Sequence, residues 1–346
     1  MIDTSLPHGE PVALPGRPFG RIARSVLGYA LLTALMIVTP MLVFVPAALF
    51  HCAIRNGRSA AWSAMVLAIA ATALMYAGAT TAAQPDAAKM AWSYLAGVTL
   101  AVALPSMAAL PLVERGESFG RVLVFLLAGS TLGLAATELG SRAVMAFSPF
   151  AAQVAEAHAS SAKFVEIYRS KGLPPDMVAM AERWIGYGAY VLPAVILINV
   201  TLVFILSLLM FGRLKAWRQF AATRTTHDSF GAYLFRNFAL PDWLLFAFVL
   251  GGLTPIASGM LQKVAANVLA LVAFLYILQG LAIFRFMLLA MGAGFAGTML
   301  GWIVLAFMSV TGIGPLLLGV AGLFDPFFDF RHFKKRKDDS HESHSD

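Results

Sequence analysis

The sequence predicts an all-α, polytopic integral membrane protein, a helix bundle with about eight to ten spans of roughly 20 apolar residues each. Three observations lead to this fold class. Hydrophobic residues make up 59% of the 346 residues and charged residues only 12%. The mean hydropathy is +0.77. A chain of this composition lacks the polar surface that a water-soluble globule needs.

The net charge and the cysteine content limit the classes of partner and cofactor that we expect. A net charge of +7 would also suit a nucleic-acid-binding protein. In an apolar chain, however, Lys and Arg usually lie at lipid headgroups and in cytoplasmic loops, so we expect membrane lipid and no nucleic acid as a partner. The single cysteine, Cys52, excludes an internal disulfide and any Cys-based metal or redox motif. We expect no metal and no cofactor.

The first element follows a polar N-terminal segment, residues 1–26, that contains four prolines and three arginines. The apolar stretch after it is too long for the core of a signal peptide and lacks a cleavage site, which predicts an uncleaved first span. This stretch, Leu27 to Ile54, is interrupted at Thr39 and Pro40. It forms either one long tilted helix or a tight pair of short helices.

Further apolar runs follow along the chain, and each is a candidate span. They are Trp62 to Ala77, Trp92 to Val113, Val122 to Phe147, Trp184 to Phe211, Trp243 to Ser258 and Val264 to Met291. Trp92, Trp184 and Trp243 each open one of these runs, and tryptophan favours the membrane–water interface. The last apolar region, Phe295 to Phe324, is broken by a turn at residues 311–315 and either crosses or doubles back.

The distribution of basic residues predicts the orientation. The loop of residues 212–241 carries five Lys or Arg residues against one Asp, and the tail of residues 334–346 begins with four basic residues in succession. Such segments favour the cytoplasmic side, whereas residues 148–183 balance four basic with four acidic side chains and suit the outer side. We therefore expect a bacterial inner-membrane protein with both termini in the cytoplasm and a membrane domain over residues 27–333.

The outer segment predicts a helical hairpin. An Ala-rich helix from about Ala151 should end at Gly172, and Pro175 should begin a second helix.

Two motifs resemble enzyme sites but lack the context that catalysis needs. Residues 116–120 read Gly-Glu-Ser-Phe-Gly, the spacing of a hydrolase nucleophile elbow, yet they lie in a short loop between two membrane helices with no strand. The sequence His341-Glu342-Ser343-His344 is one residue short of the spacing that places two zinc-binding histidines on one helix face. We expect a cytoplasmic turn, a charged tail and no enzymatic activity.

Polar residues inside membrane spans usually have a functional or a packing role, because a polar side chain in hydrocarbon costs free energy. Glu138 and Arg142, spaced i and i+4, predict a structural ion pair. Four others lack such a local partner and are candidate ligand or packing residues: Asn199, Asn267, Gln279 and Arg285. Arg285 lies near the inner end of its helix, where its side chain can reach the headgroups. For Asn267 and Gln279, packing and ligand contact remain equal alternatives.

The end of the membrane domain predicts an interface latch. Asp325 and Asp329 are four residues apart, so in a helix both carboxylates lie on one face. The neighbouring cations Arg236 and Arg331 lie at the same inner interface and are the expected partners. The latch would tie the C-terminal helix to the loop before Trp243, while the phenylalanines around it anchor the chain in the headgroup region.

The same stretch carries a family resemblance. Gly322 to Arg331 reads GLFDPFFDFR. Together with FRNF at 235–238, LPDW at 240–243, the helix of residues 267–276 and QGLA at 279–282, it resembles the YybS-like family of bacterial membrane proteins, domain of unknown function 2232. The resemblance covers roughly residues 27–333. The family is distantly similar to the substrate-capture subunits of energy-coupling-factor vitamin transporters, which implies a small-molecule pocket near the outer face.

This chain departs from those subunits, which are shorter six-helix proteins, by the outer hairpin and the extra spans. The function expected first is therefore to bind a small molecule or help to transport it. The alternative is a non-transporting membrane scaffold for cell-envelope or division machinery. The sequence contains no P-loop, so an ATP-driven step would need a partner membrane subunit.

Overall fold

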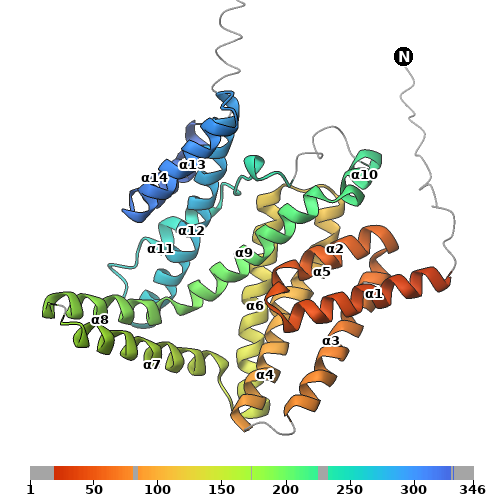
Figure 1. Cartoon of the computed structure of the whole chain (residues 1–346), viewed down its shortest axis with the longest axis horizontal. Coiled ribbons are helices and arrows are strands. Elements are labelled where there is room, and N and C mark those ends of the chain that lie inside the picture. Colours follow the sequence, from red (N-terminus) through yellow and green to blue (C-terminus); the bar gives the residue numbers. More distant parts are fainter. Residues whose placement is uncertain (1–18, 81–84, 173, 225–232, 329, 331–346) are drawn as a thin grey trace, which may run out of the picture.

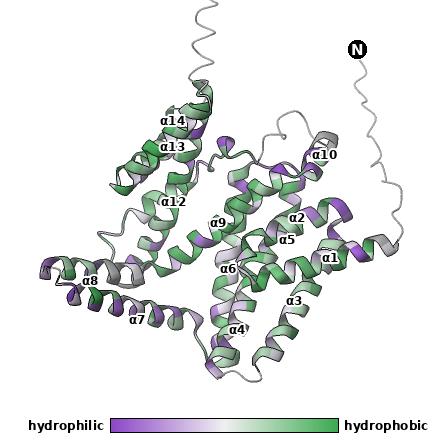
Figure 2. Ribbon diagram, viewed as in Figure 1, coloured by the Kyte–Doolittle hydropathy of each residue, from purple (hydrophilic) through white to green (hydrophobic). Residues whose placement is uncertain are grey.

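The computed structural model describes residues 19–80, 85–172, 174–224, 233–328 and 330. Helices connected by short turns make up these residues, and no strand occurs among them (Figure 1). Apolar residues cover most of the long helices, while α7, α8 and α10 carry more polar surface (Figure 2). The protein is thus the all-α, polytopic membrane bundle that the sequence predicts.

The first apolar region is a pair of short helices. Helix α1 (Phe19–Val38) ends at Thr39, and Pro40 opens the 3-10 helix η1 (Pro40–Phe44), which leads into α2 (Val45–Asn56). Proline has no N–H to continue α1, and the Thr39 side chain accepts a hydrogen bond from the Met41 N–H at 3.4 Å instead. Gly57, with φ of +92°, turns the chain into α3 (Arg58–Thr80).

Helix α4 (Pro85–Val98), the π-helical turn η2 (Thr99–Ala103) and α5 (Leu104–Glu114) form one span. Pro105 cannot donate to the Ala101 carbonyl in the turn before it, and the Ser130 hydroxyl of α6 (Phe119–Met145) donates to that carbonyl instead. Helix α6 packs against η2 at Gly133, where an added Cβ would lie 2.1 Å from the Leu100 oxygen.

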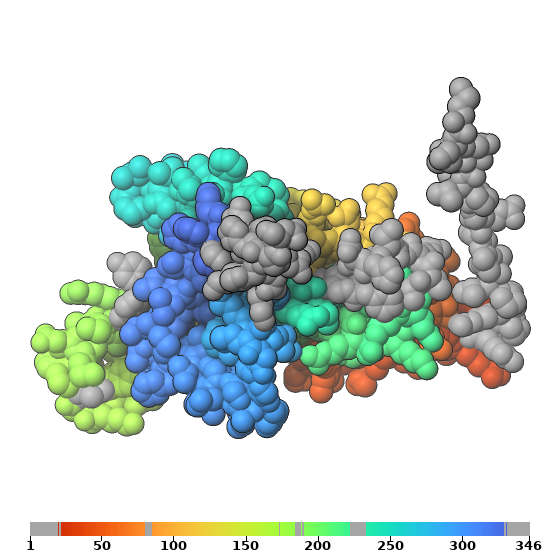
Figure 3. Space-filling view, turned by 90° about the horizontal axis from the view of Figure 1, so that it is seen from above, coloured from red at the N-terminus to blue at the C-terminus, as the bar shows by residue number. Residues whose placement is uncertain are grey.

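The predicted hairpin is present. Helix α7 (Pro149–Ser170) is followed by Gly172 with φ of +68°, and α8 (Pro175–Tyr190) returns along it. An ion pair of 2.6 Å joins Arg169 of α7 to Glu182 of α8. The hairpin projects to one side of the molecule in Figure 3.

Helix α9 (Leu192–Arg213) runs between the N-terminal and C-terminal helices and continues into α10 (Lys215–Arg224) (Figures 1 and 3). The span expected from Trp184 begins at Leu192 instead, because the chain breaks at Val191 just before Pro193, and Trp184 belongs to α8. Helix α10 packs against α2 and α9.

The C-terminal helices begin with η4 (Phe235–Asn237), α11 (Leu244–Gly251) and α12 (Gly259–Ala290). Helix α11 has only eight residues, about 12 Å at 1.5 Å per residue, so the apolar run from Trp243 to Ser258 does not form one span-length helix. The helix ends at the consecutive glycines Gly251 and Gly252, and Pro255 follows them. Helices α13 (Phe295–Val310) and α14 (Ile313–Phe328) complete the fold.

Five helical segments of the described chain are long and apolar enough to cross a membrane: Arg58–Ala79, Pro85–Glu114, Phe119–Met145, Leu192–Arg213 and Gly259–Ala290. Helices α13 and α14 make a sixth candidate if they are counted together, but they bend by 109° at Thr311 and Gly312. The last apolar region is therefore two helices joined at a sharp bend, and not one straight span. A total of eight to ten spans is reached only if shorter apolar helices such as α1 and α2 are counted as well.

Candidate functional site: the buried Gln279 cluster

The closest helix contact among the C-terminal elements joins α12 to α14. A Cβ on Gly280 would lie 1.9 Å from the Leu318 oxygen, and a Cβ on Gly322 would lie 2.0 Å from the Tyr276 oxygen. Only glycine fits at these two positions, so the two backbones touch directly. The contact between α12 and α14 is the most extensive contact between two helices in the described chain.

Beside this contact lies a buried polar cluster. The Gln279 side chain is only 2% exposed. Its oxygen accepts a hydrogen bond from the Leu240 N–H at 3.1 Å, and its amide nitrogen donates to a carboxylate oxygen of Asp325 at 3.0 Å. Asp325, in α14, is 9% exposed. One side chain of α12 thus holds both α14 and the loop before Trp243.

The predicted latch between Asp325, Asp329, Arg236 and Arg331 can be compared with these contacts in part. Asp325 is tied to the loop before Trp243 through Gln279, whereas Arg236 lies exposed on η4. Asp329 and Arg331 lie outside the described residues. The ionic part of the latch therefore stays a prediction.

Asn267 lies on the same helix and also binds protein groups. Its side-chain oxygen accepts a hydrogen bond from the Ala194 N–H at 2.8 Å, and its amide nitrogen donates to the carbonyl oxygens of Tyr190 at 3.2 Å and Lys263 at 2.8 Å. Tyr190 ends α8, and Ala194 lies in the first turn of α9. The amide therefore satisfies backbone groups that the helix break leaves without intrahelical partners.

Asn199 and Arg285 differ from these two amides because both are exposed. Asn199 lies in α9 among exposed apolar residues that follow at helical spacing: Val195, Leu202, Leu206 and Met210. Within the described part of the chain, neither Asn199 nor Arg285 forms a side-chain hydrogen bond or an ion pair with another residue. Of the four candidates, Asn267 and Gln279 thus bind other groups of the protein, whereas Asn199 and Arg285 lie at its surface.

Glu138 and Arg142 form the ion pair that their spacing predicts, at 2.6 Å. The Glu138 carboxylate also accepts a hydrogen bond from the Phe150 N–H at 3.1 Å. The pair therefore holds the corner between α6 and α7. Its role in this structure is to fix that corner.

The Gly-Glu-Ser-Phe-Gly segment forms the expected turn between α5 and α6, and its serine caps α6. Gly116 has φ of +72°, and the Ser118 hydroxyl accepts a hydrogen bond from the Arg121 N–H at 3.4 Å at the start of α6. Phe119 then packs edge-on against Tyr233, whose pKa is raised by burial and by the nearby Glu117 carboxylate. The Tyr233 phenol is therefore neutral at physiological pH. The residues His341 and His344 lie outside the described chain.

The hairpin contains a groove with charged residues in its lining. It has a volume of about 480 Å³ between α7 and α8, and its lining includes His158, Glu166, Arg169 and Glu182. No group of three or more His, Cys, Asp or Glu residues in the described chain is arranged to hold a metal ion.

Sequence reasoning selected Gln279 and Asp325 separately and missed their contact. Forty-six positions separate them in the chain. One signal was available, because each lies near a glycine of the α12–α14 contact: Gln279 precedes Gly280, and Asp325 follows Gly322 by three positions.

Replacing Gln279 by Leu should lower the free energy of unfolding by about 2–3 kcal/mol, because the buried Leu240 N–H and the Asp325 carboxylate each lose a partner. Thermal unfolding in detergent measures this. The matched control is Gln262→Leu on the same helix, which should change stability by less than about 0.5 kcal/mol. Equal melting temperatures for Gln279→Leu and the wild type would mean that the cluster does not hold α14.

A family model described as "Predicted membrane protein (DUF2232)" matches residues 25–326. The match runs from α1 into α14 and contains Gln279 and Asp325. Searches of curated proteins and of solved structures give no match, so the distant similarity to substrate-capture subunits stays a prediction. Because the match covers most of the chain, this protein belongs to the DUF2232 family of predicted membrane proteins.

Proposed function

We propose that this protein is a non-catalytic membrane scaffold that binds a partner subunit within the bilayer of the bacterial inner membrane. The observation that carries the proposal is the exposed amide of Asn199 in the middle of a span. An amide that faces hydrocarbon without a partner loses its hydrogen bonds, at a cost of roughly 1–3 kcal/mol. A polar side chain on a neighbouring membrane helix removes that cost.

The surroundings of Asn199 support this proposal. Val195, Leu202 and Leu206 are 40%, 38% and 50% exposed and flank the amide on the same face of α9. This is the pattern of a helix-packing surface with one polar contact. Gln279 and Asn267, the residues best placed to bind a solute within the bundle, already hold protein groups.

The placement of charge supports a cytoplasmic position for α10 and the C-terminus. Arg58 at the start of α3 pairs with Glu114 at the end of α5, and α10, with Lys215 and Arg218, packs against α2. These basic segments share the upper end of the molecule in Figure 1 with the end of α14, while α7 and α8 lie towards the other end. The positive-inside rule puts the basic end in the cytoplasm.

A small-molecule function is the second candidate, and the groove between α7 and α8 favours it. Its lining carries acidic, basic and imidazole groups, which would suit a polar or zwitterionic solute. This location agrees with the outer pocket that the family resemblance implies. Identifying small molecules that purify with the protein in native lipid would separate this function from the scaffold.

The orientation predicts opposite labelling of two engineered cysteines. Ser160→Cys on α7 should react with a membrane-impermeant thiol reagent from outside intact cells, and Lys215→Cys on α10 should react only after the membrane is opened. Cys52 is fully buried and should stay unlabelled in both cases. Labelling of both cysteines from the same side would overturn this topology.

The scaffold proposal predicts that a specific protein lies against α9. A photo-crosslinking residue in place of Leu206 should give a discrete protein adduct in cells, and Asn199→Leu should reduce its yield because the interhelical hydrogen bond is lost. Asn199→Gln should keep part of it. An adduct of twice the chain mass would identify the partner as a second copy.

The control is the same crosslinker at Leu74, which is 75% exposed on α3. It should give lipid adducts without that protein band. If both positions yield the same band, or if Asn199→Leu leaves the yield unchanged, α9 does not bind a partner through Asn199.

A further inference from the structure

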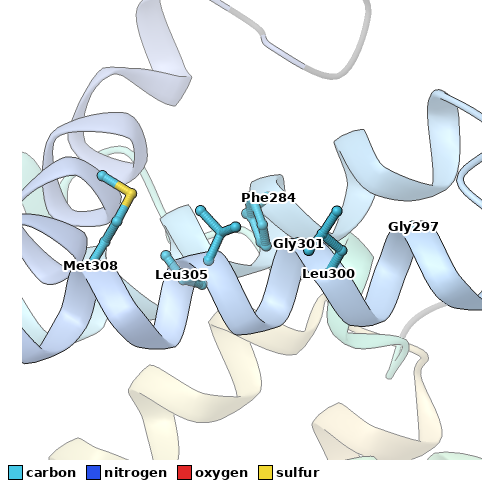
Figure 4. A pocket seen from close by; sticks show the side chains of 7 residues that line it. Phe284, Gly297, Leu300, Gly301, Leu305 and Met308 are labelled. Atoms are coloured by element: carbon cyan, nitrogen blue, oxygen red, sulfur yellow. The ribbon is translucent and has the colours of Figure 1, made fainter.

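An apolar groove lies between α12 and α13. Its volume is about 310 Å³, and its lining includes Phe284 of α12 with Gly297, Gly301, Val304 and Met308 of α13 (Figure 4). Gly297 and Gly301 contribute only backbone to its wall. Helix α13 itself has no buried residue, so the groove lies at the surface of the bundle.

The lining fixes the chemistry of what can fill the groove. It contains no charged side chain, and dispersion contacts with hydrocarbon are the favourable interaction that such walls offer. From Gly297 to Met308 the groove follows twelve residues of helix, a rise of about 16 Å at 1.5 Å per residue. This length and this apolar lining suit a lipid acyl chain.

A charged residue adjoins a lining residue of the groove in the sequence. Arg285 directly follows Phe284 in α12, and it is exposed. It is five residues before the end of α12 at Ala290, about 7.5 Å along the helix axis. A guanidinium at this depth can extend along its own stem to the headgroup region. There a phosphate oxygen is its natural partner, since Arg binds phosphate with two parallel hydrogen bonds.

The contacts of α13 place the groove and the arginine at the same level. An added Cβ on Gly301 would lie 3.0 Å from a methyl carbon of Leu288 and 3.5 Å from the Phe284 ring. The Phe284 and Trp302 rings pack edge to face at 5.6 Å. The first half of α13 therefore lies against the turns of α12 that carry Arg285.

We propose that this groove is a binding site for one anionic phospholipid, with an acyl chain along α13 and the phosphate at Arg285. The site lies on different helices from the α9 surface and does not depend on the scaffold function. It would fix α13, which the rest of the bundle covers little, against α12.

Native mass spectrometry of the full-length protein in detergent tests the site. Phosphatidylglycerol and phosphatidylcholine with the same acyl chains are added in equal amounts. The wild type should retain phosphatidylglycerol in about fivefold preference, the attraction expected from one basic residue near a membrane surface. Arg285→Gln should abolish the preference, and Arg285→Lys should keep part of it.

A second pair of variants tests the contact between the acyl chain and the groove. Val304→Trp fills the groove and should lower retention of both lipids, whereas Ile303→Trp is on the same helix at a position that does not line the groove and should lower neither. Val304 and Ile303 are 50% and 55% exposed, so both variants should fold, and a melting curve checks this. The proposal fails if the wild type shows no preference, if Arg285→Gln keeps it, or if the two Trp variants behave alike.

Discussion

The whole fold depends on one constraint: a backbone polar group inside a membrane needs a partner within the protein. The helices of this chain break repeatedly, and at several breaks a side chain from another helix supplies the partner. Ser207 of α9 donates to the Val43 carbonyl of η1, Ser130 of α6 donates to Ala101 in η2, and Asn267 of α12 bridges the break between α8 and α9. Gln279 does the same for Leu240.

These repairs explain why the bundle tolerates short helices. Prolines at 46, 105 and 193 lie at or next to three of the breaks, and each removes one backbone donor. A buried hydroxyl or amide nearby offsets that loss. The polar residues inside the spans are thus mostly part of the architecture, and Asn199 and Arg285 are the two groups on which we base the proposed binding surfaces.

Much of the fold follows from the sequence. Long apolar runs predict α3, the α4–α5 span, α6, α9 and α12, and Gly172 with the prolines after it predicts the turn of the hairpin. The run after Trp243 misled the span count, since its composition suits a span while two glycines and Pro255 end the helix after eight residues. Hydropathy averages over such local breaks, so the eight to ten spans expected exceed the five or six helical segments of the described chain that are long enough to cross.

The candidate site was predicted only in part. The cost of a buried amide singled out Gln279 and Asn267, and the charge of Asp325 singled out the latch. Their partners were not predictable, because Gln279 contacts Leu240 and Asp325 at separations of 39 and 46 residues. Such pairings depend on how α12 and α14 meet, which Gly280 and Gly322 determine. The i, i+4 pair of Glu138 and Arg142 was predictable because one helix fixes its geometry.

The central claim is that the amides of Gln279 and Asn267 supply partners for backbone groups inside the bundle, while the exposed amide of Asn199 serves binding. The melting temperatures of Asn267→Leu and Asn199→Leu in detergent test it most directly, since the substitution is the same at both sites. Asn267→Leu should melt several degrees lower than the wild type, because two backbone groups lose their partner at a cost of about 2 kcal/mol. Asn199→Leu should melt at or above the wild-type temperature. Equal melting for Asn267→Leu and the wild type, or a lowered value only for Asn199→Leu, would contradict the account.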